Sequence, residues 1–209
     1  MNVSKTQSQL IKKAIKDSEL KAQIEIVPVI LSQSDYYPVA HFRLGILMAI
    51  VFAILLYLSP LHFINPLWYL TIQLPGFFTG YMLAYLPQLR RYFITKEETE
   101  EEVYQRSVEL FFEEKIHMTK DHNGVLILVS LLERKIEIIL DHGLLEKCPP
   151  ESVAEVTKHF AEKMKAGETY EAMRGCIDEL SHLFENYFPR QTPKKFSDNE
   201  IKDDLIFRK

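Results

Sequence analysis

Two segments that lie far apart in the sequence carry the side chains most capable of chemistry. Asp121-His122-Asn123 comes directly before an apolar run, and Asp141-His142 follows the next predicted strand. Carboxylate and amide oxygens are preferred ligands of hard cations such as Ca²⁺ and Mg²⁺, and a bound cation can position a phosphate group. If the two segments meet, Asp121, Asn123 and Asp141 are predicted to form a calcium or magnesium site.

These residues also have a purely structural interpretation. Asp and Asn often end strands, because their side chains bond to nearby amides and their backbones tolerate unusual angles. The two histidines lack a third ligand at the spacing that is typical of a zinc site. The sequence alone leaves both the site hypothesis and the turn hypothesis open.

The two segments can meet because a predicted strand pair lies between them. Residues 125–132 form a nearly continuous apolar run, typical of a strand that is buried on both faces. Residues 135–138 alternate polar with apolar, as a half-exposed strand does. A tight turn between these runs would place Gly124 opposite Gly143 and bring the two segments to one edge of the sheet.

The opposite edge of this sheet would hold Asp35 beside the turn residues Glu133 and Arg134. Ligands often bind at strand ends in α/β folds, so Asp35 could contribute to a site there. The simpler interpretation is that a Ser-Asp pair ends a strand. The sequence contains no phosphate-binding glycine loop, paired CxxC, HExxH or nucleophile elbow, and Cys176 lies on the apolar side of a predicted helix.

The remaining elements predict an α/β fold, a small sheet flanked by helices. Residues 24–31 predict another strand, with Pro28 at an edge or a bulge because proline donates no hydrogen bond. The first two strands are expected to be parallel. Helices are predicted at residues 6–21, 97–118, 150–165 and 168–187.

An uncharged stretch interrupts this domain. Residues 44–63 carry no formal charge, and twelve of these 20 residues are Leu, Ile, Val or Phe. A helix of that length spans about 30 Å, the thickness of the hydrocarbon core of a bilayer. Residues 66–86 are also uncharged but less apolar, with a kink expected at Pro75-Gly76. The two stretches predict a transmembrane helical hairpin within residues 41–92.

Small residues recur every four positions in both stretches and could form the contact between the two helices. They are Gly45, Ala49 and Ala53 in the first, and Gly76, Gly80 and Ala84 in the second. Such stripes let two helix backbones approach closely. The pairs expected in an antiparallel hairpin are Ala53 with Gly76, Ala49 with Gly80, and Gly45 with Ala84. The alternative is a chance match, since Gly and Ala are common in membrane helices.

Positive charges flank the hairpin on one side only. Arg43 precedes the first stretch, Arg90, Arg91 and Lys96 follow the second, and the turn between them has no Lys or Arg. The positive-inside rule therefore predicts an inner-membrane protein whose two termini and α/β domain are cytoplasmic.

The sequence thus divides into three parts. Residues 1–40 and 93–190 are predicted to form one discontinuous domain, residues 41–92 the hairpin, and residues 191–209 a polar tail. The net charge of −4 and the pI near 6.0 argue against nucleic-acid binding, which requires a basic surface. The expected partners are the lipid bilayer and another membrane protein, and the oligomeric state is not determined by the sequence.

Several segments outside the hairpin resemble the TPM domain family, most closely its short bacterial branch with a two-helix membrane insertion. They are Gln23-Ile24-Glu25-Ile26-Val27-Pro28-Val29, residues 123–130 (NGVLILVS), residues 132–138 (LERKIEI), Asp141-His142-Gly143-Leu144, and the helix end Tyr187-Phe188-Pro189. The resemblance implies a small α/β sandwich. Some members of the family are credited with acid phosphatase activity or a bound calcium ion, and others are accessory proteins for photosystem repair or for a receptor channel.

A compact domain whose only candidate site is sparse leaves two functions open for the chain. The first is a non-enzymatic, membrane-anchored accessory or interaction module for envelope proteins. The alternative is a weak, metal-assisted acid phosphatase that acts on phosphomonoesters through Asp121, Asn123 and Asp141. Many longer members open with an Asp-containing motif before the first helix, and residues 1–13 lack it, so the sequence favours the accessory role.

Overall fold

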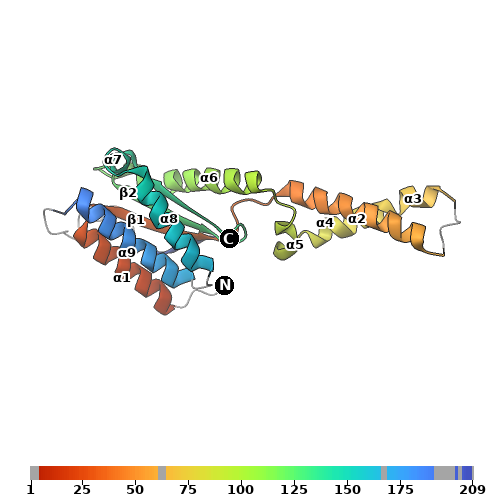
Figure 1. Cartoon of the computed structure of the whole chain (residues 1–209), viewed down its shortest axis with the longest axis horizontal. Helices are drawn as coiled ribbons and strands as arrows, with labels where there is room; N and C mark the ends of the chain where they lie inside the picture. The colour runs from red at the N-terminus through yellow and green to blue at the C-terminus, as the bar shows by residue number, and fades with distance from the viewer. Residues whose placement is uncertain (1–4, 61–64, 166–168, 191–200, 202–203, 209) are drawn as a thin grey trace. The chain divides into compact units, whose positions relative to one another are not determined.

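A computed structural model describes residues 5–60, 65–165, 169–190, 201 and 204–208 of the chain. It divides the chain into two compact units, which are coloured along the sequence in Figure 1. The described residues within 1–34 and 103–209 form the α/β unit, and residues within 35–102 form the helical unit.

The α/β unit contains a mixed sheet in which four strands are described, in the order β3-β2-β1-β4. The strands are β1 (Glu25–Leu31), β2 (Gly124–Ser130), β3 (Lys135–Leu140) and β4 (Ile206–Arg208). β1 is parallel to β2 and β4, and β2 is antiparallel to β3. The predicted parallel pairing of the first two strands is confirmed. The sequence does not predict β4, which lies in the segment interpreted as a polar tail.

Helices cover both faces of this sheet (Figure 1). They are α1 (Lys5–Lys21), α8 (Pro150–Lys165) and α9 (Thr169–Tyr187) on one face, and on the other α6 (Lys96–Glu113), whose residues from Val103 onward belong to this unit. Along β1, Ile26 and Ile30 join the first core while Val27 and Val29 join the second. Because successive side chains point to opposite faces, a strand with a core on each side is apolar throughout, and all residues of β1 and β2 are buried.

Pro28 occupies a position in β1 that has a strand on only one side in the described structure. β2 pairs with β1 along its whole length, whereas β4 pairs only from Val29 onward. A residue without a backbone donor is tolerated where the ladder is incomplete. The predicted edge position of Pro28 therefore holds for the first half of β1. The second half of β1 lies between β2 and β4.

The predicted helix at residues 97–118 is shorter in the structure. α6 ends at Glu113, Lys115 has a positive φ of 58°, and a 3₁₀ turn, η1 (Ile116–Met118), follows. A left-handed residue ends an α-helix because it turns the chain away from the helix axis. The chain then packs against the start of β2, where a Cβ on Gly124 would lie 2.3 Å from Ile116 Cγ2.

The register of the β2–β3 hairpin differs from the prediction by two residues. Val125 pairs with Leu140, so Gly124 lies opposite Asp141 rather than Gly143, and the Asp141 amide donates to the Gly124 carbonyl at 2.9 Å. A shift of two residues leaves every side chain on its original face. The two segments with candidate site residues therefore still meet at one end of the sheet.

The cause of this register is the connection at residues 131–134, which is longer than the predicted tight turn. The Glu133 carboxylate accepts hydrogen bonds from the Ser34 amide at 2.8 Å and from the Ser130 hydroxyl. The Leu131 amide donates to the carbonyl of Leu31, the last residue of β1, and the Leu132 amide donates to the Ser32 carbonyl. These bonds, which depend on a strand distant in sequence, fix where β3 begins.

The helical unit consists of α2 (Pro38–Leu58), α3 (Leu67–Thr71), α4 (Gln73–Leu83) and α5 (Pro87–Arg91). Among the described residues, only α2 is long and apolar enough to cross a membrane. The predicted hairpin of two membrane-spanning helices is therefore not confirmed: the second stretch, predicted as one kinked helix over residues 66–86, is divided at Ile72 into α3 and α4. Pro75 has no N–H to donate to the Thr71 carbonyl, and its ring crowds that carbonyl.

α2 and α4 pack antiparallel along small residues, but one helical turn away from the predicted register. A Cβ on Gly76 would lie 2.9 Å from Ala49 Cα, and one on Gly80 would lie 2.9 Å from Gly45 Cα. Gly76 therefore faces Ala49 rather than Ala53, and Gly80 faces Gly45 rather than Ala49. α2 ends at Leu58, earlier than the predicted residue 63, so the connection is longer and the facing positions shift.

The charged end of the helical unit is tied together by polar contacts. Arg43 donates to both carboxylate oxygens of Glu98, at 2.6 and 2.9 Å, and to the Phe93 carbonyl at 2.8 Å. Glu98 and Thr95 also form a capping box at the start of α6. At the same end of α2, His41 is buried against the rings of Tyr81 and Tyr85.

Candidate metal centre

The loop that precedes β2 is folded so that it exposes one histidine. Thr119 is buried, and its carbonyl and hydroxyl accept hydrogen bonds from the amides of His122 and Asn123 at 3.2 and 3.1 Å. His122 has a φ of 49°, a left-handed conformation that turns its side chain outward. The Asn123 side chain donates to the Gln23 carbonyl at 2.8 Å, so it anchors the loop to the segment before β1.

Asp141 ends β3 and caps the short helix α7 (His142–Leu145). Its Oδ1 accepts a hydrogen bond from the His142 amide at 2.7 Å, the usual role of an N-cap aspartate. The side chain is only 6% exposed. Its other oxygen, Oδ2, is buried and has no hydrogen-bond partner among the described residues.

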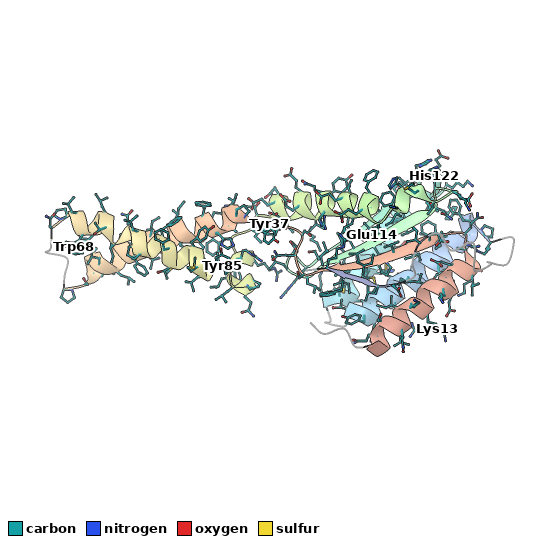
Figure 2. All side chains as sticks on the ribbon, turned by 180° about the vertical axis from the view of Figure 1, so that it is seen from behind. Lys13, Tyr37, Trp68, Tyr85, Glu114 and His122 are labelled. Atoms are coloured by element: carbon teal, nitrogen blue, oxygen red, sulfur yellow. The ribbon has the colours of Figure 1, made fainter. Side chains whose placement is uncertain are left out.

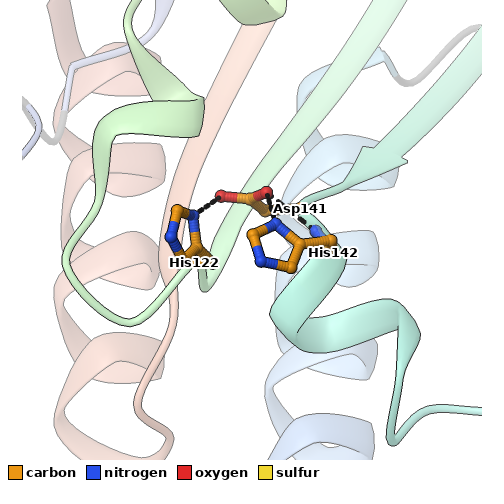
Figure 3. Close-up of side chains that lie close together, drawn as sticks. All are labelled: His122, Asp141 and His142. Atoms are coloured by element: carbon orange, nitrogen blue, oxygen red, sulfur yellow. Dashed lines mark hydrogen bonds and ion pairs between the residues drawn. The ribbon is translucent and has the colours of Figure 1, made fainter.

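His122 and His142 stand on either side of this carboxylate (Figure 3). His122 Nδ1 lies 3.4 Å from Asp141 Oδ2, and His142 Nδ1 lies 3.1 Å from Oδ1. The two rings are 4.1 Å apart between centroids, and their side chains are 46% and 62% exposed. One donor atom from each of the three residues can be chosen so that all lie within 4.8 Å of one another.

Gly143 allows the two segments to approach this closely. A Cβ at this position would lie 2.6 Å from the His122 carbonyl oxygen and 2.8 Å from the Asp121 carbonyl oxygen. Real Cβ atoms do not come so near to backbone, so a larger residue would push the loop away from α7. Both histidines are thus positioned by backbone contacts as well as by the sheet.

The structure groups the predicted site residues differently from the sequence. Asp121 is outside the cluster, and its carboxylate accepts a hydrogen bond from the Gln23 side chain at 2.5 Å. Asn123 has the anchoring role described above. Of the three predicted oxygen ligands, Asp141 alone belongs to the cluster, and the other members are His122 and His142. The signal that indicates them is the repeated Asp-His pair, once before β2 and once after β3.

A pocket of about 380 Å³ opens beside the two histidines. Asp121, Glu146 and Lys147 also line it, and the Lys147 ammonium lies 4.9 Å from the centroid of the Phe188 ring. A larger pocket of about 660 Å³ lies beside β4, where the acidic side chains of Glu113 and Glu114 pair with Arg208. The smaller pocket is the candidate site, because it alone of these two is lined by the two histidines of the cluster.

The other residues considered from the sequence have structural roles. The Asp35 carboxylate accepts a hydrogen bond from the Tyr37 amide at 2.9 Å. This bond forms a local turn just before α2 begins. Arg134 has a φ of 54° in the β2–β3 connection. Cys176 is 1% exposed within the core, and burial raises the pKa of its thiol far above its ordinary value. A thiol that stays protonated is not a nucleophile.

Comparison with known proteins places these features in a family context. Residues 87–183 match the model of the TPM domain. No curated protein matches the chain. Among solved structures, the NMR structure of the BA42 protein from the psychrophilic bacterium Bizionia argentinensis has a similar fold, with a TM-score of 0.60, 16% identity, and coverage of 99% of this chain and 96% of that chain.

The TPM match begins after the helices α2 to α4 and leaves out α1 and β1. The structure nevertheless pairs β1 with β2 along its whole length. The sheet is therefore completed by a strand that precedes the helical unit in the sequence. Residues 87–183 therefore match a TPM domain, and the chain has a mixed α/β fold with a helix-flanked sheet, similar to that of the BA42 protein.

Proposed function

We propose that the protein is a membrane-anchored TPM-domain protein that acts as a non-enzymatic interaction module for another membrane protein. In this proposal the helical unit lies in the inner membrane and the α/β unit lies in the cytoplasm. The observation that carries it is the outward-facing apolar surface of α2.

α2 presents large apolar side chains around most of its circumference. From Leu44 to its end at Leu58 it has no charged residue. In this stretch, the aliphatic side chains that are at least two-fifths exposed are Ile46, Leu47, Ile50, Ile54, Leu55 and Leu58. In water such a continuous apolar surface is unfavourable, whereas each Leu or Ile at the centre of a membrane helix contributes about −0.3 to −0.6 kcal/mol to insertion.

We propose that α3 and α4 together return the chain across the bilayer. Their hydrogen-bond ladder continues through the interruption, since the Ile72 amide donates to the Trp68 carbonyl at 2.9 Å and the Gly76 amide to the Ile72 carbonyl at 3.2 Å. Leu67 to Leu83 would span about 25 Å at 1.5 Å per residue. The packing of Gly76 and Gly80 against α2 supports a partnered helix.

Aromatic and basic residues support the orientation. Figure 2 shows Trp68 at one end of the helical unit and Tyr85 toward the other, an arrangement typical of an aromatic belt. Arg43, Arg90 and Arg91 lie in α2 and α5, near the points where the chain enters and leaves the apolar segment. By the positive-inside rule, this end faces the cytoplasm.

The interaction role is favoured over phosphomonoester hydrolysis by the environment of the predicted catalytic carboxylates. Asp121 is bonded to Gln23, and Asp141 serves as a helix cap. Cys148 and Cys176 are both buried. The outward faces of α2 and α4, by contrast, offer apolar side chains such as Ile50 and Phe78, with exposed fractions of 53% and 61%, to a neighbouring membrane helix.

The anchoring is tested by washing membranes that contain the full-length protein with alkaline carbonate. The protein is expected to stay with the membrane, and Ile50→Lys combined with Ile54→Lys is expected to release it, because each charge costs about 2.5–3.5 kcal/mol at the helix centre. The matched control is Ile50→Leu with Ile54→Leu, which should be retained. Release of the unaltered protein would refute the proposal.

Orientation and partner are tested in the same preparations. Protease added to sealed spheroplasts should leave the α/β unit intact, and protease added to inverted vesicles should cleave it. A photo-crosslinker at Phe78 should capture a membrane protein, while one at Phe77, whose ring packs against Phe42 and Tyr81 within the unit, should capture less. Hydrolysis of a generic phosphomonoester that is abolished by Asp141→Asn would favour the phosphatase over the interaction module.

A further inference from the structure

We propose that His122, Asp141 and His142 bind one divalent transition-metal ion of the zinc class through two imidazole nitrogens and Asp141 Oδ2. This inference concerns the α/β unit alone and does not depend on membrane anchoring. It differs in ligands and in metal from the calcium or magnesium site expected from the sequence.

The first argument is the unsatisfied oxygen of Asp141. Oδ1 is occupied by the His142 amide at 2.7 Å, whereas Oδ2 is buried without a hydrogen-bond partner in the described part of the chain. A buried polar atom without a partner lowers the stability of the folded state, and a charged atom does so more strongly. A bound cation would satisfy this oxygen at the point where it faces His122, whose Nδ1 is 3.4 Å away.

The second argument is the donor set. Ca²⁺ and Mg²⁺ prefer ligand shells made of oxygen atoms, whereas imidazole nitrogens suit zinc and neighbouring first-row metals. Two imidazoles and one carboxylate are a ligand set found at zinc sites with three protein ligands and one open position. The pocket beside the histidines leaves room for water or a ligand at that fourth position.

The third argument is that the geometry needs only a small adjustment. Zinc lies about 2.0–2.2 Å from nitrogen and carboxylate ligands, so two ligands of one ion are at most about 4.4 Å apart. The three donors already lie within 4.8 Å of one another. Both imidazoles are about half exposed and can rotate, while the carboxylate is held by the cap and by the pairing of Asp141 with Gly124.

The test uses the full-length protein in detergent, with any affinity tag removed, and titrates Zn²⁺ by calorimetry against a competing chelator. One equivalent per chain is expected. Co²⁺ in place of zinc should give the visible absorption of a low-coordinate site. Binding should also raise the melting temperature, because an ion that binds only the folded state stabilises it.

The variants are chosen to keep the fold. Asp141→Asn retains a side chain that caps helices well, and His122→Asn places at a φ of 49° a residue that tolerates this conformation. Each is expected to lower zinc affinity at least about 100-fold, since even outer-shell changes cost 10- to 100-fold. The matched control, His159→Asn on α8, removes an exposed histidine that pairs with Glu179 and should leave affinity unchanged.

Three outcomes would overturn the inference. One is the absence of stoichiometric zinc binding by the unaltered protein. Another is binding that survives both Asp141→Asn and His122→Asn while these variants melt normally without metal. The third is a rise in melting temperature with Ca²⁺ or Mg²⁺ but not with Zn²⁺, which would favour a site made of oxygen ligands. Circular dichroism of each metal-free variant shows whether a lost signal reflects the site or the fold.

Discussion

The two units of this chain use apolar residues in opposite ways. In the α/β unit, isoleucines and leucines of α1, β1, β2 and α9 point into two cores on either side of the sheet. In the helical unit, many isoleucines and leucines of α2 point outward, and glycines of α4 lie against the backbone of α2. The apolar content of a segment therefore does not determine which of its faces is packed.

Under the proposed membrane anchoring, the difference follows from the solvent that surrounds each unit. In water, folding gains free energy from burying large apolar side chains, so these form the core. Between helices in lipid that gain is absent, and close packing of small residues takes its place. The experiments below compare the same substitution in both units.

An isoleucine-to-alanine change should give the largest contrast. Ile177 in α9 is fully buried, and Ile177→Ala is expected to lower the free energy of unfolding by about 2–5 kcal/mol, because it removes buried methyl groups and leaves a cavity. Ile54 in α2 is 51% exposed, and Ile54→Ala should change stability by less than about 0.5 kcal/mol. Denaturant unfolding in detergent measures both. Equal losses would contradict the outward orientation of α2.

A glycine-to-alanine change should destabilise the helical unit more than the α/β unit, the reverse of the order expected for isoleucine. A Cβ on Gly80 would lie 2.4 Å from the Leu44 carbonyl oxygen, so Gly80→Ala should destabilise the α2–α4 contact by about 1–3 kcal/mol. On Gly175 in α9 the nearest heavy atom would be Lys163 Nζ at 3.2 Å, the end of a flexible side chain. Gly175→Ala should therefore be neutral or stabilise by up to about 1 kcal/mol. Melting temperatures that fall for both variants would argue against this contrast.

Removing the charge of Glu98 should weaken the helical unit in a pH-dependent way. The hydrogen bonds from Arg43 and from the Thr95 amide lower the pKa of Glu98 below its ordinary value. A lowered pKa gives stability that is present above the unfolded-state pKa and is lost as the pH falls through the folded-state pKa. Glu98→Gln should therefore melt earlier than the unaltered protein at neutral pH, and the difference should disappear in acid.

Removing the charge of Glu137 in β3 should change the melting temperature in the opposite direction, and by the smallest amount in these experiments. Burial raises the pKa of Glu137, although Lys135 partly offsets the rise. A carboxyl group with a raised pKa binds its proton more tightly when folded, so stability falls as the pH rises through the interval between the unfolded and folded values. Glu137→Gln should melt slightly later than the unaltered protein at neutral pH and identically in acid. An earlier melting temperature at neutral pH would contradict this.

Regular elements were predictable from the sequence because their signals are local. Apolar periodicity and strand composition predict α8 at the bounds that the structure has, and α1, α9, β1 and β2 to within a few residues. The helix interruption near Pro75 also follows from a local property, the missing N–H of proline. The elements that the sequence misses, among them β4, α5 and α7, are short, and β4 is held by its pairing with β1.

The sequence alone was enough to predict the longer strands and helices and the meeting of two Asp-containing segments at one end of a sheet. Only the tertiary structure decided that Asp121 bonds to Gln23 and that His122 and His142 flank the buried carboxylate of Asp141. It also decided the facing pairs of α2 and α4. The physical reason is that registers and ligand sets depend on hydrogen bonds and contacts between residues far apart in sequence, such as those of Glu133 with Ser34.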